Sequence, residues 1–503
     1  MNRTFNLIAR LVLPSLGLAH ATLFLAFWLT NRLFYSSTND YLAKMLGKRL
    51  DYVSLCLLFA GLVTVWSAAR LFFYRSKKTH RLAVLATWLY SLLTLFFIAF
   101  FYGSFWILLK ESPVQLPRLA QMLLYFRVIL DPLLLLCVSL LAGLWVRHNL
   151  IQRKSAGRPV ASLPITLLLL GFAVLWVLPL VFPPESVIRE TLPGKPLVIA
   201  HRGAAMLAPE NTLASANLAV DLGVDGLETD IHISRDGLPF LMHDDTFVRT
   251  TNVKVVFPGR EKERVEYFTL AEALQLNAGQ WFVEQDPYQT ITRGQVSAGQ
   301  LDEYHRQTVP PLAQELQIVR QKKLIFIFDL KQPPDDQPYA ISFFDICLSQ
   351  IQTAGIDPQV WFNVDTAQLA VLRQVAPAMK PAYFIDYRTP PPAVGSKEAG
   401  YQIINSEYGL SKSWIRQYQA AGLWINLYTI DEPWQFSRLW LLGVGSTTTT
   451  NPQAMIALRQ PVLSLSFTRF LVLWNLFGIV VLAGLLGLIL PVFQSHPYSF
   501  HCL

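Results

Sequence analysis

Two histidines in the middle of the chain directly follow short apolar runs, where they could do acid–base chemistry. His201 and Arg202 come after the run from Val198 to Ala200, and His243 comes after the run from Leu238 to Met242. An imidazole changes its protonation near neutral pH, so it can give or accept a proton in the working range of most enzymes. A guanidinium beside it can bind an anion through paired N–H groups. These residue types predict a site that moves protons on an anionic substrate.

Two carboxylates occur within the apolar run from Val224 to Ile233. Glu228 and Asp230 are two positions apart, so on an extended strand both side chains project to one face. Like charges so close repel each other unless a cation lies between them, and a hard divalent ion prefers oxygen ligands. Such an ion, an arginine and two histidines suit phosphodiester cleavage. The cations would offset charge on the phosphoryl oxygens, while the histidines would deprotonate the attacking hydroxyl and protonate the leaving alkoxide.

The segments around these residues alternate between strand and helix. A strand at Val198–Ala200, a helix at Asn211–Leu222 and a strand at Val224–Ile233 form a β-α-β unit, which places its chemistry at the carboxyl ends of its strands. Further apolar runs predict six more strands, at Leu324–Leu330, Val360–Val364, Ala382–Ile385, Gln402–Asn405, Leu423–Thr429 and Val444–Thr447. Helical stretches lie between them, at Ala340–Thr353, Thr366–Val375, Lys412–Ala421 and Pro433–Leu442. The alternation predicts an α/β TIM barrel, with an inserted lobe over its mouth at about residues 244–310.

Three motifs in this region resemble the signature of the glycerophosphodiester phosphodiesterase family. They read HRGAAMLAPENT from residue 201, LETD from residue 227 and DGLPFLMHDDTFVRTTN from residue 236, and the resemblance covers roughly residues 195–458. The multi-pass membrane branch of the family, which has six spans in animals, looks most similar. The polar region has no Asn-x-Ser/Thr site, which favours a bacterial homologue of that branch. The resemblance implies a TIM barrel that binds one divalent cation, Ca²⁺ or Mg²⁺, and hydrolyses glycerophosphodiesters.

The resemblance also assigns roles to residues of this chain. It implies that His201 and His243 are the catalytic acid/base pair and that Arg202 binds the phosphate. It further implies that Glu228 and Asp230 are metal ligands. Which histidine is the acid and which is the base stays open.

Four further positions are expected to complete the site. The third metal ligand of the family, usually glutamate, falls on Asp329, and Lys331 beside it is expected to contact the substrate or its phosphate. The family places Glu210 in the pocket near the substrate, although this residue could instead cap the helix that starts there. Trp424 is a candidate substrate-binding residue on a late strand, together with Tyr428, but core packing is nearly as good an explanation for either ring.

The composition indicates a membrane protein. Of 503 residues 52% are hydrophobic, and a mean hydropathy of +0.35 is too high for an ordinary soluble chain. The formal net charge of +8 lies largely in short loops between apolar spans, so it concerns membrane orientation, and no nucleic-acid partner is expected. Cys347 is the only cysteine in the large polar region, which excludes a disulfide within that region.

Six apolar stretches each supply roughly the 20 residues that a transmembrane helix needs. They lie near Leu7–Trp28, Tyr52–Phe73, Leu82–Leu109, Met122–Val146, Leu163–Phe182 and Phe470–Val492. This predicts five transmembrane helices in residues 1–184, the catalytic barrel in residues 185–465, and the sixth helix with a short tail in residues 466–503. Basic residues are more numerous in the loops that lie inside when the N-terminus is inside. The protein is therefore expected in the cell membrane, with cytoplasmic termini and an outward-facing catalytic domain.

Two other functions remain open from the sequence. Six spans favour a substrate taken from the membrane, so phospholipase C- or D-like cleavage of lysophospholipids or glycosylphosphatidylinositol anchors is the rival enzyme activity. The rival from another class is a membrane receptor or structural protein whose barrel binds a ligand without turnover. It predicts a gap in the catalytic set, where the only departure is aspartate for glutamate at Asp329. The oligomeric state stays open.

Overall fold

The computed structural model describes residues 13–30, 50–73, 115–156 and 162–494, together with residue 159 and scattered residues between 35 and 103. The chain divides into two compact units. We call residues 193–462 the barrel unit. The helical unit comprises the chain before residue 193 and after residue 462.

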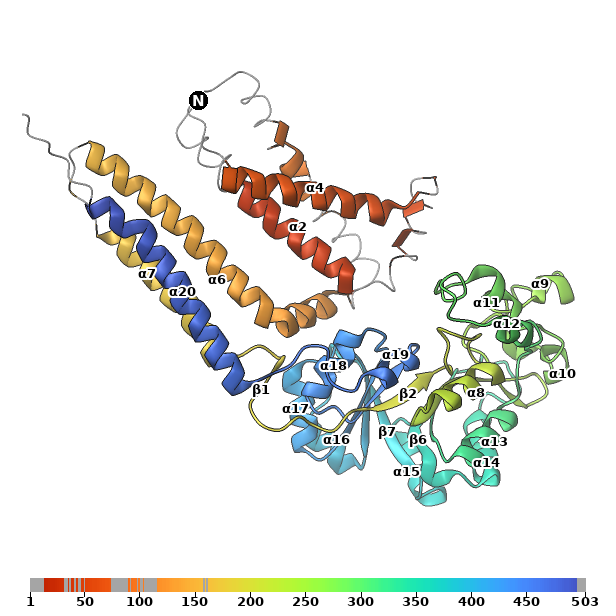
Figure 1. Ribbon diagram of the computed structural model, residues 1–503. Coiled ribbons are helices and arrows are strands. Elements are labelled where there is room, and N and C mark those ends of the chain that lie inside the picture. The colour runs from red at the N-terminus through yellow and green to blue at the C-terminus, as the bar shows by residue number, and fades with distance from the viewer. Residues whose placement is uncertain are drawn as a thin grey trace, which may run out of the picture. The chain divides into compact units, whose positions relative to one another are not determined.

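Eight parallel strands form a closed barrel in the barrel unit. Strands β2, β6 and β7 are labelled in Figure 1. The strands follow one another around the barrel in the order β2 (Leu197–His201), β3 (Gly226–Ile233), β5 (Ile325–Leu330), β6 (Val360–Asn363), β7 (Lys380–Ile385), β8 (Ile403–Glu407), β9 (Trp424–Tyr428) and β10 (Ser446–Thr449). Pairing of β10 with β2 closes the ring. Each strand coincides with a predicted one, so the predicted TIM barrel is confirmed. The short strand β4 (Pro239–Leu241), which runs antiparallel to β3, was not predicted.

The interior of the barrel is apolar near its base and polar further along the strands. Inward side chains form a buried cluster that includes Ile199, Ile327, Trp361, Ala382 and Ile403. Two residues further along, Asn405 Nδ2 donates to Asn363 Oδ1 at 3.2 Å, and Asn426 Nδ2 donates to Asn405 Oδ1 at 2.9 Å. Because side chains alternate along a strand, the next inward residues, at the carboxyl ends, face the barrel mouth.

Helices follow the strands of the barrel, and the last of them, α19, comes after the final strand β10. They are α8 (Leu213–Leu222), α13 (Leu312–Lys322), α14 (Phe343–Ala354), α15 (Thr366–Val375), α16 (Ala393–Ala399), α17 (Lys412–Ala420), α18 (Pro433–Leu441) and α19 (Pro452–Ala457). The predicted helices coincide with α8, α14, α15, α17 and α18. Local sequence explains the limits of α8: Thr212 forms a capping box with Ser215, and Gly223 ends the helix with a left-handed φ of 83°.

Short helices fill the segment between β4 and α13. They are α9 (Val253–Val256), the 3-10 helix η3 (Val265–Tyr267), α10 (Leu270–Ala273), α11 (Gln280–Gln285) and α12 (Ala298–Tyr304). Part of this lobe has its own apolar cluster, which includes Phe247, Phe268 and Leu276. The lobe is attached to β3 by a buried pair, in which Nδ1 of His232 lies 2.8 Å from Oε1 of Glu266.

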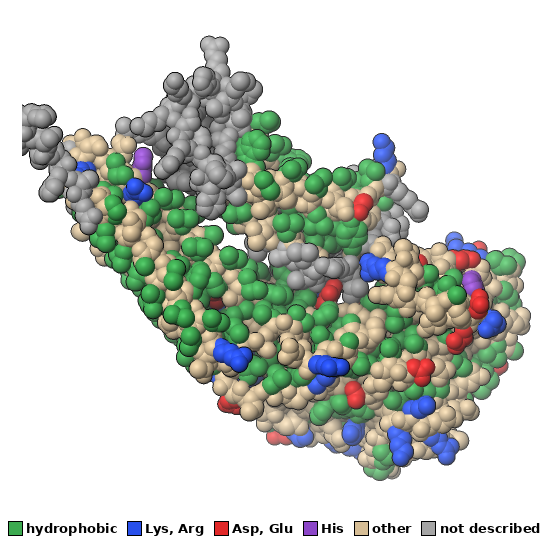
Figure 2. All heavy atoms as spheres, viewed as in Figure 1, with side chains coloured by type: hydrophobic (Ala, Val, Ile, Leu, Met, Phe, Trp, Pro, Cys, Tyr) green, Lys and Arg blue, Asp and Glu red, His purple; other side chains and the backbone are tan. Residues whose placement is uncertain are grey.

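The helical unit contains α2 (Leu13–Thr30), α4 (Tyr52–Phe73), α6 (Gln115–Ser155), α7 (Leu163–Val181) and α20 (Phe467–Gln494). Three of these helices, α6, α7 and α20, are long and apolar enough to cross a membrane by length and composition. Figure 2 shows hydrophobic side chains gathered over them, and large apolar residues such as Leu133, Leu170 and Val472 are exposed. Such a surface indicates association with a membrane.

The positions of these helices can be compared with those of the six predicted transmembrane spans. Helices occupy the positions of the first, second, fourth, fifth and sixth spans, while most of the third, Leu82–Leu109, lies outside the described residues. The count of six spans therefore stays a prediction. Within the helical unit, β1 (Val187–Ile188) pairs in parallel with β11 (Leu465–Ser466), so the segment that leads to the barrel unit is hydrogen-bonded to the segment that returns from it.

Candidate active site

The carboxyl ends of β2, β3 and β5 bring predicted residues to one side of the barrel mouth. His201, the last residue of β2, is in register with Glu228 on β3, and Asp230 is in register with Asp329 on β5. The Arg202 N–H donates to the Glu228 carbonyl at 2.7 Å and extends the pairing past the end of β2. Glu228, Asp230 and Asp329 share the inward face of their strands. The register of the sheet therefore assembles this part of the predicted site.

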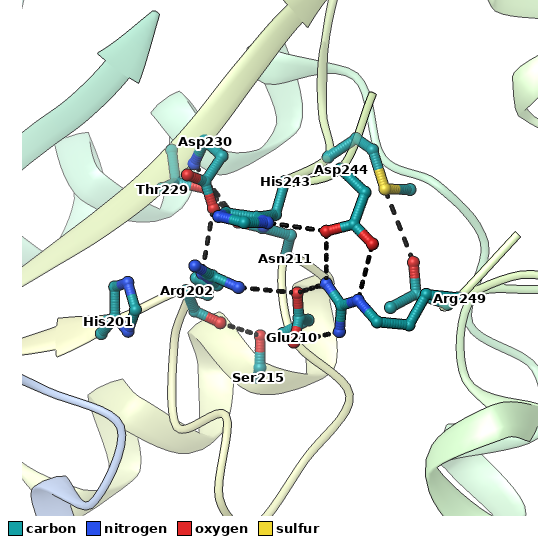
Figure 3. Close-up of polar contacts among 12 residues, drawn as sticks. His201, Arg202, Glu210, Asn211, Ser215, Thr229, Asp230, His243, Asp244 and Arg249 are labelled. Atoms are coloured by element: carbon teal, nitrogen blue, oxygen red, sulfur yellow. Dashed lines mark hydrogen bonds and ion pairs between the residues drawn. The ribbon is translucent and has the colours of Figure 1, made fainter. Parts of the chain in front are cut away.

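The Arg202 side chain lies between two carboxylates (Figure 3). Its Nη1 donates to Glu210 Oε1 at 3.0 Å, and its Nε lies 3.1 Å from Asp230 Oδ2. Burial alone would lower the pKa of Arg202, but the charges of Asp230 and Glu210 raise it, so the side chain stays a cation. Its backbone is left-handed, with φ 58°, and Gly203 follows at 78°. This turn places a fixed positive charge at the end of β2.

Several donors and cations surround Asp230. Its Oδ2 accepts from Asn211 Nδ2 at 2.9 Å, and its Oδ1 lies 2.9 Å from Lys331 Nζ. Burial alone would raise the pKa of Asp230, but the charges of Arg202 and Lys331 lower it to about 2. Asp230 is therefore ionised at neutral pH. Asn211 was not among the predicted site residues, although it stands beside Glu210 in the APENT motif.

Glu228 and His201 are also buried, and fewer hydrogen-bond donors surround them than surround Asp230. Oε2 of Glu228 lies 3.7 Å from Nε2 of His201 and has no hydrogen-bond partner among the residues that the structure describes. Burial, reinforced by the charge of Asp230, raises the pKa of Glu228 well above its usual range. Burial and the charge of Arg202 lower the pKa of His201 to about 3. At neutral pH the His201 imidazole is therefore neutral.

His243 follows β4 and is oriented by its neighbour (Figure 3). Its Nδ1 lies 2.7 Å from Oδ1 of Asp244. Burial alone would raise the pKa of Asp244, but hydrogen bonds from His243 and Arg249 lower it well below the usual range. Because an ionised carboxylate only accepts hydrogen bonds, Nδ1 of His243 carries the hydrogen, and Nε2 is the atom left for substrate chemistry.

Arg249 connects the two loops of the site. Its Nε and Nη2 donate to Asp244 at 2.6 and 2.8 Å, and its Nη1 and Nη2 donate to Glu210 at 3.0 and 2.7 Å. Because Glu210 also binds Arg202, hydrogen bonds run without a break from Arg202 to His243 (Figure 3). Glu210 does not cap α8, since Thr212 does. We therefore assign Glu210 to the site and not to the helix end.

No role in the site was predicted for Arg249 or Asp244. Both stand in the motif that contains His243, so their proximity to that histidine was a usable signal. The contact with Glu210 spans 39 positions of the chain and depends on how the lobe folds back over the mouth, which no local pattern reveals.

Lys331 lies between Asp230 and Asp329, with its Nζ 2.9 and 2.6 Å from their carboxylates. Among the described residues no three histidine, cysteine, aspartate or glutamate side chains stand together at metal-binding distances. The donor chemistry nevertheless fits a hard cation. Glu228 has an unpartnered buried oxygen, and the charges of Asp230 and Asp329 both raise its pKa, so the three predicted ligands lie within electrostatic reach of one another.

Trp424 lies at the opposite end of the barrel, so the structure does not bring it to the other predicted residues. It is the first residue of β9, and its Nε1 donates to Ser446 Oγ at the start of β10, at 3.0 Å. Its ring also lies 6.1 Å from that of Trp361, in the apolar cluster. The direction of the strand corrects the prediction that Trp424 contacts the substrate, because only the carboxyl end of β9 reaches the mouth. Tyr428 is the residue at that end.

The model of the glycerophosphoryl diester phosphodiesterase family matches residues 201–454. The chain belongs to this family. The match begins at His201 and spans the barrel strands to β10, so it includes every residue of the site described above. The family resemblance of the sequence motifs is thereby confirmed.

Three curated members of the family are similar to this chain. The chicken "glycerophosphodiester phosphodiesterase domain-containing protein 5" is 33% identical over 339 residues, or 66% of this chain and 55% of that protein. The mouse "glycerophosphoinositol inositolphosphodiesterase" is 34% identical over 316 residues, or 62% and 57%. The macaque (Macaca fascicularis) "domain-containing protein 4" is 29% identical over 459 residues, or 88% and 71%. The chain thus spans little more than half the length of the first two.

Proposed function

We propose that this protein hydrolyses glycerophosphodiesters by histidine acid/base catalysis with a divalent cation. The observation that carries the proposal is the state of the two imidazoles. His201 is buried and neutral, whereas His243 is held by the ionised Asp244 with its Nε2 left for the substrate. The cations Arg202 and Lys331 stand in the same mouth. Two oriented imidazoles beside fixed positive charges are what transfer of a phosphoryl group to a hydroxyl needs.

Each group has a defined part in the proposed reaction. Arg202 and Lys331 hold the phosphodiester and offset charge that develops on its free oxygens. One histidine accepts the proton of the attacking hydroxyl, which belongs to water or to the neighbouring glycerol. The other gives its proton to the leaving alkoxide. His201 is placed for one of these two roles by its position at the end of β2, beside Glu228 and Arg202. His243 can donate from Nε2 when protonated, because the Asp244 carboxylate stabilises that charge.

Glu228, Asp230 and Asp329 are the residues that would hold Ca²⁺ or Mg²⁺. When bound, such an ion neutralises charge on the phosphoryl oxygens. The unpartnered oxygen of Glu228 supports this assignment, because a carboxylate buried beside two other acids is stabilised by a cation. Lys331 contacts both Asp230 and Asp329, so its ammonium group would compete with the ion for these two carboxylates.

The proposed setting is the outer face of a cell membrane, with six spans and both termini in the cytoplasm. The exposed apolar surfaces of α6, α7 and α20 support membrane attachment. The same attachment favours the rival enzyme activity, cleavage of lysophospholipids or glycosylphosphatidylinositol anchors. The mouse relative is named for a soluble substrate, glycerophosphoinositol, and we place that substrate class first.

Turnover by the detergent-purified full chain tests the proposal. Glycerophosphocholine, glycerophosphoinositol and lysophosphatidylcholine would be compared with Ca²⁺, with Mg²⁺ and with chelator, and the product bearing the phosphate identified. We expect turnover of the soluble diesters, lost with chelator and lowered about 10²- to 10⁴-fold in His201→Ala and His243→Ala. His305→Ala, an exposed histidine of the lobe, is the matched control. Cleavage of lipids alone would overturn the substrate class, and full activity of His201→Ala would overturn the mechanism.

A further inference from the structure

The strands across the mouth from His201 and Glu228 carry a different set of side chains. In the ring of eight strands, β7 lies opposite β2 and β8 lies opposite β3. Ala382 on β7 and Ile403 on β8 belong to the interior cluster, so alternation turns Phe384 and Glu407 toward the mouth. Phe384 is 55% exposed. A large apolar ring left open at the mouth of a barrel indicates a ligand surface.

Three aromatic rings gather at this side. The ring of Phe384 stacks on that of Tyr428, with 5.6 Å between centroids and 21° between planes. Their strands, β7 and β9, flank β8, so the stacked pair lies over the end of β8. Tyr387, in the loop after β7, packs against Gly409, in the loop after β8, where a Cβ would lie 2.5 Å from the tyrosine ring. The guanidinium carbon of Arg388 lies 6.0 Å from the centroid of the same ring. The rings offer π faces, which carry partial negative charge.

Glu407, the last residue of β8, adds a carboxyl group to this side of the mouth. No hydrogen bond or ion pair of its carboxylate is found within the described residues, whereas Arg388 is bound to Asp386 at 2.7 Å. Burial raises the pKa of Glu407, the charge of Asp386 raises it further, and the charge of Arg388 lowers it. Burial and the charge of Glu407 raise the pKa of Tyr428 far above its usual range, so this phenol stays neutral. This side of the mouth is therefore aromatic and anionic.

We propose that Phe384, Tyr387, Glu407 and Tyr428 form a wall that binds the cationic headgroup of a glycerophosphodiester, with choline as the preferred headgroup. This inference rests on the proposed function, since it names the substrate of the same site. A quaternary ammonium is attracted to ring faces and to a nearby carboxylate. Arg202 and Lys331 stand on the strands across the mouth and attract the phosphate. A zwitterionic substrate thus meets the opposite charge at each end, whereas inositol has no charge for the wall.

Choline binding tests the wall without turnover. Calorimetric titration of the full-length protein in detergent would measure the Kd of choline chloride in the wild type, Glu407→Gln and Phe384→Leu. We expect each substitution to raise this Kd about five- to thirtyfold, the range for loss of a partly desolvated cation contact. Glu398→Gln, an exposed carboxylate on α16, is the matched control and should bind choline like the wild type. A choline Kd that neither substitution changes overturns the wall.

Turnover distinguishes failure of this inference from failure of the proposed function. The kcat/KM values for glycerophosphocholine, glycerophosphoethanolamine and glycerophosphoinositol would be measured in the same proteins. We expect the choline-to-inositol ratio to fall about tenfold in Glu407→Gln. If the enzyme is active and its choline-to-inositol ratio of kcat/KM is unchanged, the wall is refuted but the proposed phosphodiesterase activity is not. Choline binding that depends on Glu407, in a protein that cleaves none of the three diesters, supports the wall and refutes the phosphodiesterase. A preference for ethanolamine refutes choline as the headgroup.

Discussion

Replacing Arg249 by methionine should damage catalysis and stability together, because this residue joins both loops of the site. The substitution keeps an unbranched side chain, shorter than that of arginine, and removes four hydrogen bonds, two to Asp244 and two to Glu210. His243 would keep its bond to Asp244, but Asp244 would lose the group that fixes its position. Glu210 would keep Arg202 alone. We therefore expect His243 to sample orientations in which its Nε2 misses the substrate.

The magnitude follows from burial. Glu210 is buried but Arg249 is partly exposed, so the two bonds to Glu210 are worth about 1 kcal/mol each, and those to the more exposed Asp244 are worth about 0.5 kcal/mol each, which gives about 3 kcal/mol of unfolding free energy. Mispositioning of one acid/base group should lower kcat/KM about 10- to 100-fold, or about 1.4 to 2.7 kcal/mol of transition-state stabilisation. Denaturant unfolding and steady-state kinetics of the full chain would measure the two effects.

The pH dependence adds a signature that is specific to the bridge. Hydrogen bonds from Arg249 help to hold the pKa of Asp244 and of Glu210 below their usual ranges, against the effect of burial. The stability gained in this way is fully present above about pH 5 and is lost as pH falls through the acidic range. The difference between wild type and Arg249→Met should therefore shrink on acidification. Arg320→Met, an exposed arginine on α13, is the control. Wild-type kcat/KM in Arg249→Met would refute the positioning role.

Two further predictions concern residues around the site. Gly203→Ala should lower both kcat/KM and the unfolding free energy, the latter by several kcal/mol. The reason is that φ is 78° at this position and that a Cβ would lie 2.6 Å from the backbone of Ser215 in α8. Circular dichroism melts and kinetics would test this, and a wild-type melting temperature would contradict it. Burial raises the pKa of Glu315 to about 8, so ionisation in the unfolded chain lowers stability as pH rises from about 4 toward 8. Glu315→Gln should therefore gain stability relative to wild type, by about 1 kcal/mol or more between pH 5 and 8, and a pH-independent difference in unfolding free energy would contradict this.

Most barrel strands could be predicted because each contains a short apolar run next to turn residues, and this pattern does not depend on distant contacts. Strand β10, which reads Ser-Thr-Thr-Thr, is the exception. The site needed more. His201, Glu228 and Asp230 could be placed together from one β-α-β unit, since neighbouring parallel strands end at the same edge. Trp424 and Tyr428 occupy the two ends of β9, and the rule that chemistry lies at the carboxyl end would have selected Tyr428 alone.

Other parts of the site depend on tertiary contacts that leave no local trace. The bond between Arg249 and Glu210 forms only when the lobe folds over the mouth. Lys331 was expected to contact substrate, but its position between Asp230 and Asp329 depends on the register of β3 with β5. The stack of Phe384 on Tyr428 joins two strands that are not neighbours, so neither sequence spacing nor strand pairing predicts it.

The parallel pairing of β1 with β11 has a consequence for limited proteolysis of the purified protein. The barrel unit is a single continuous segment, joined to the helical unit at both of its ends. A single cut between β1 and the barrel leaves the second peptide connection intact, and β1 stays paired with β11 within the helical unit. Separation of the barrel unit from the helices therefore requires two cuts, one at each junction.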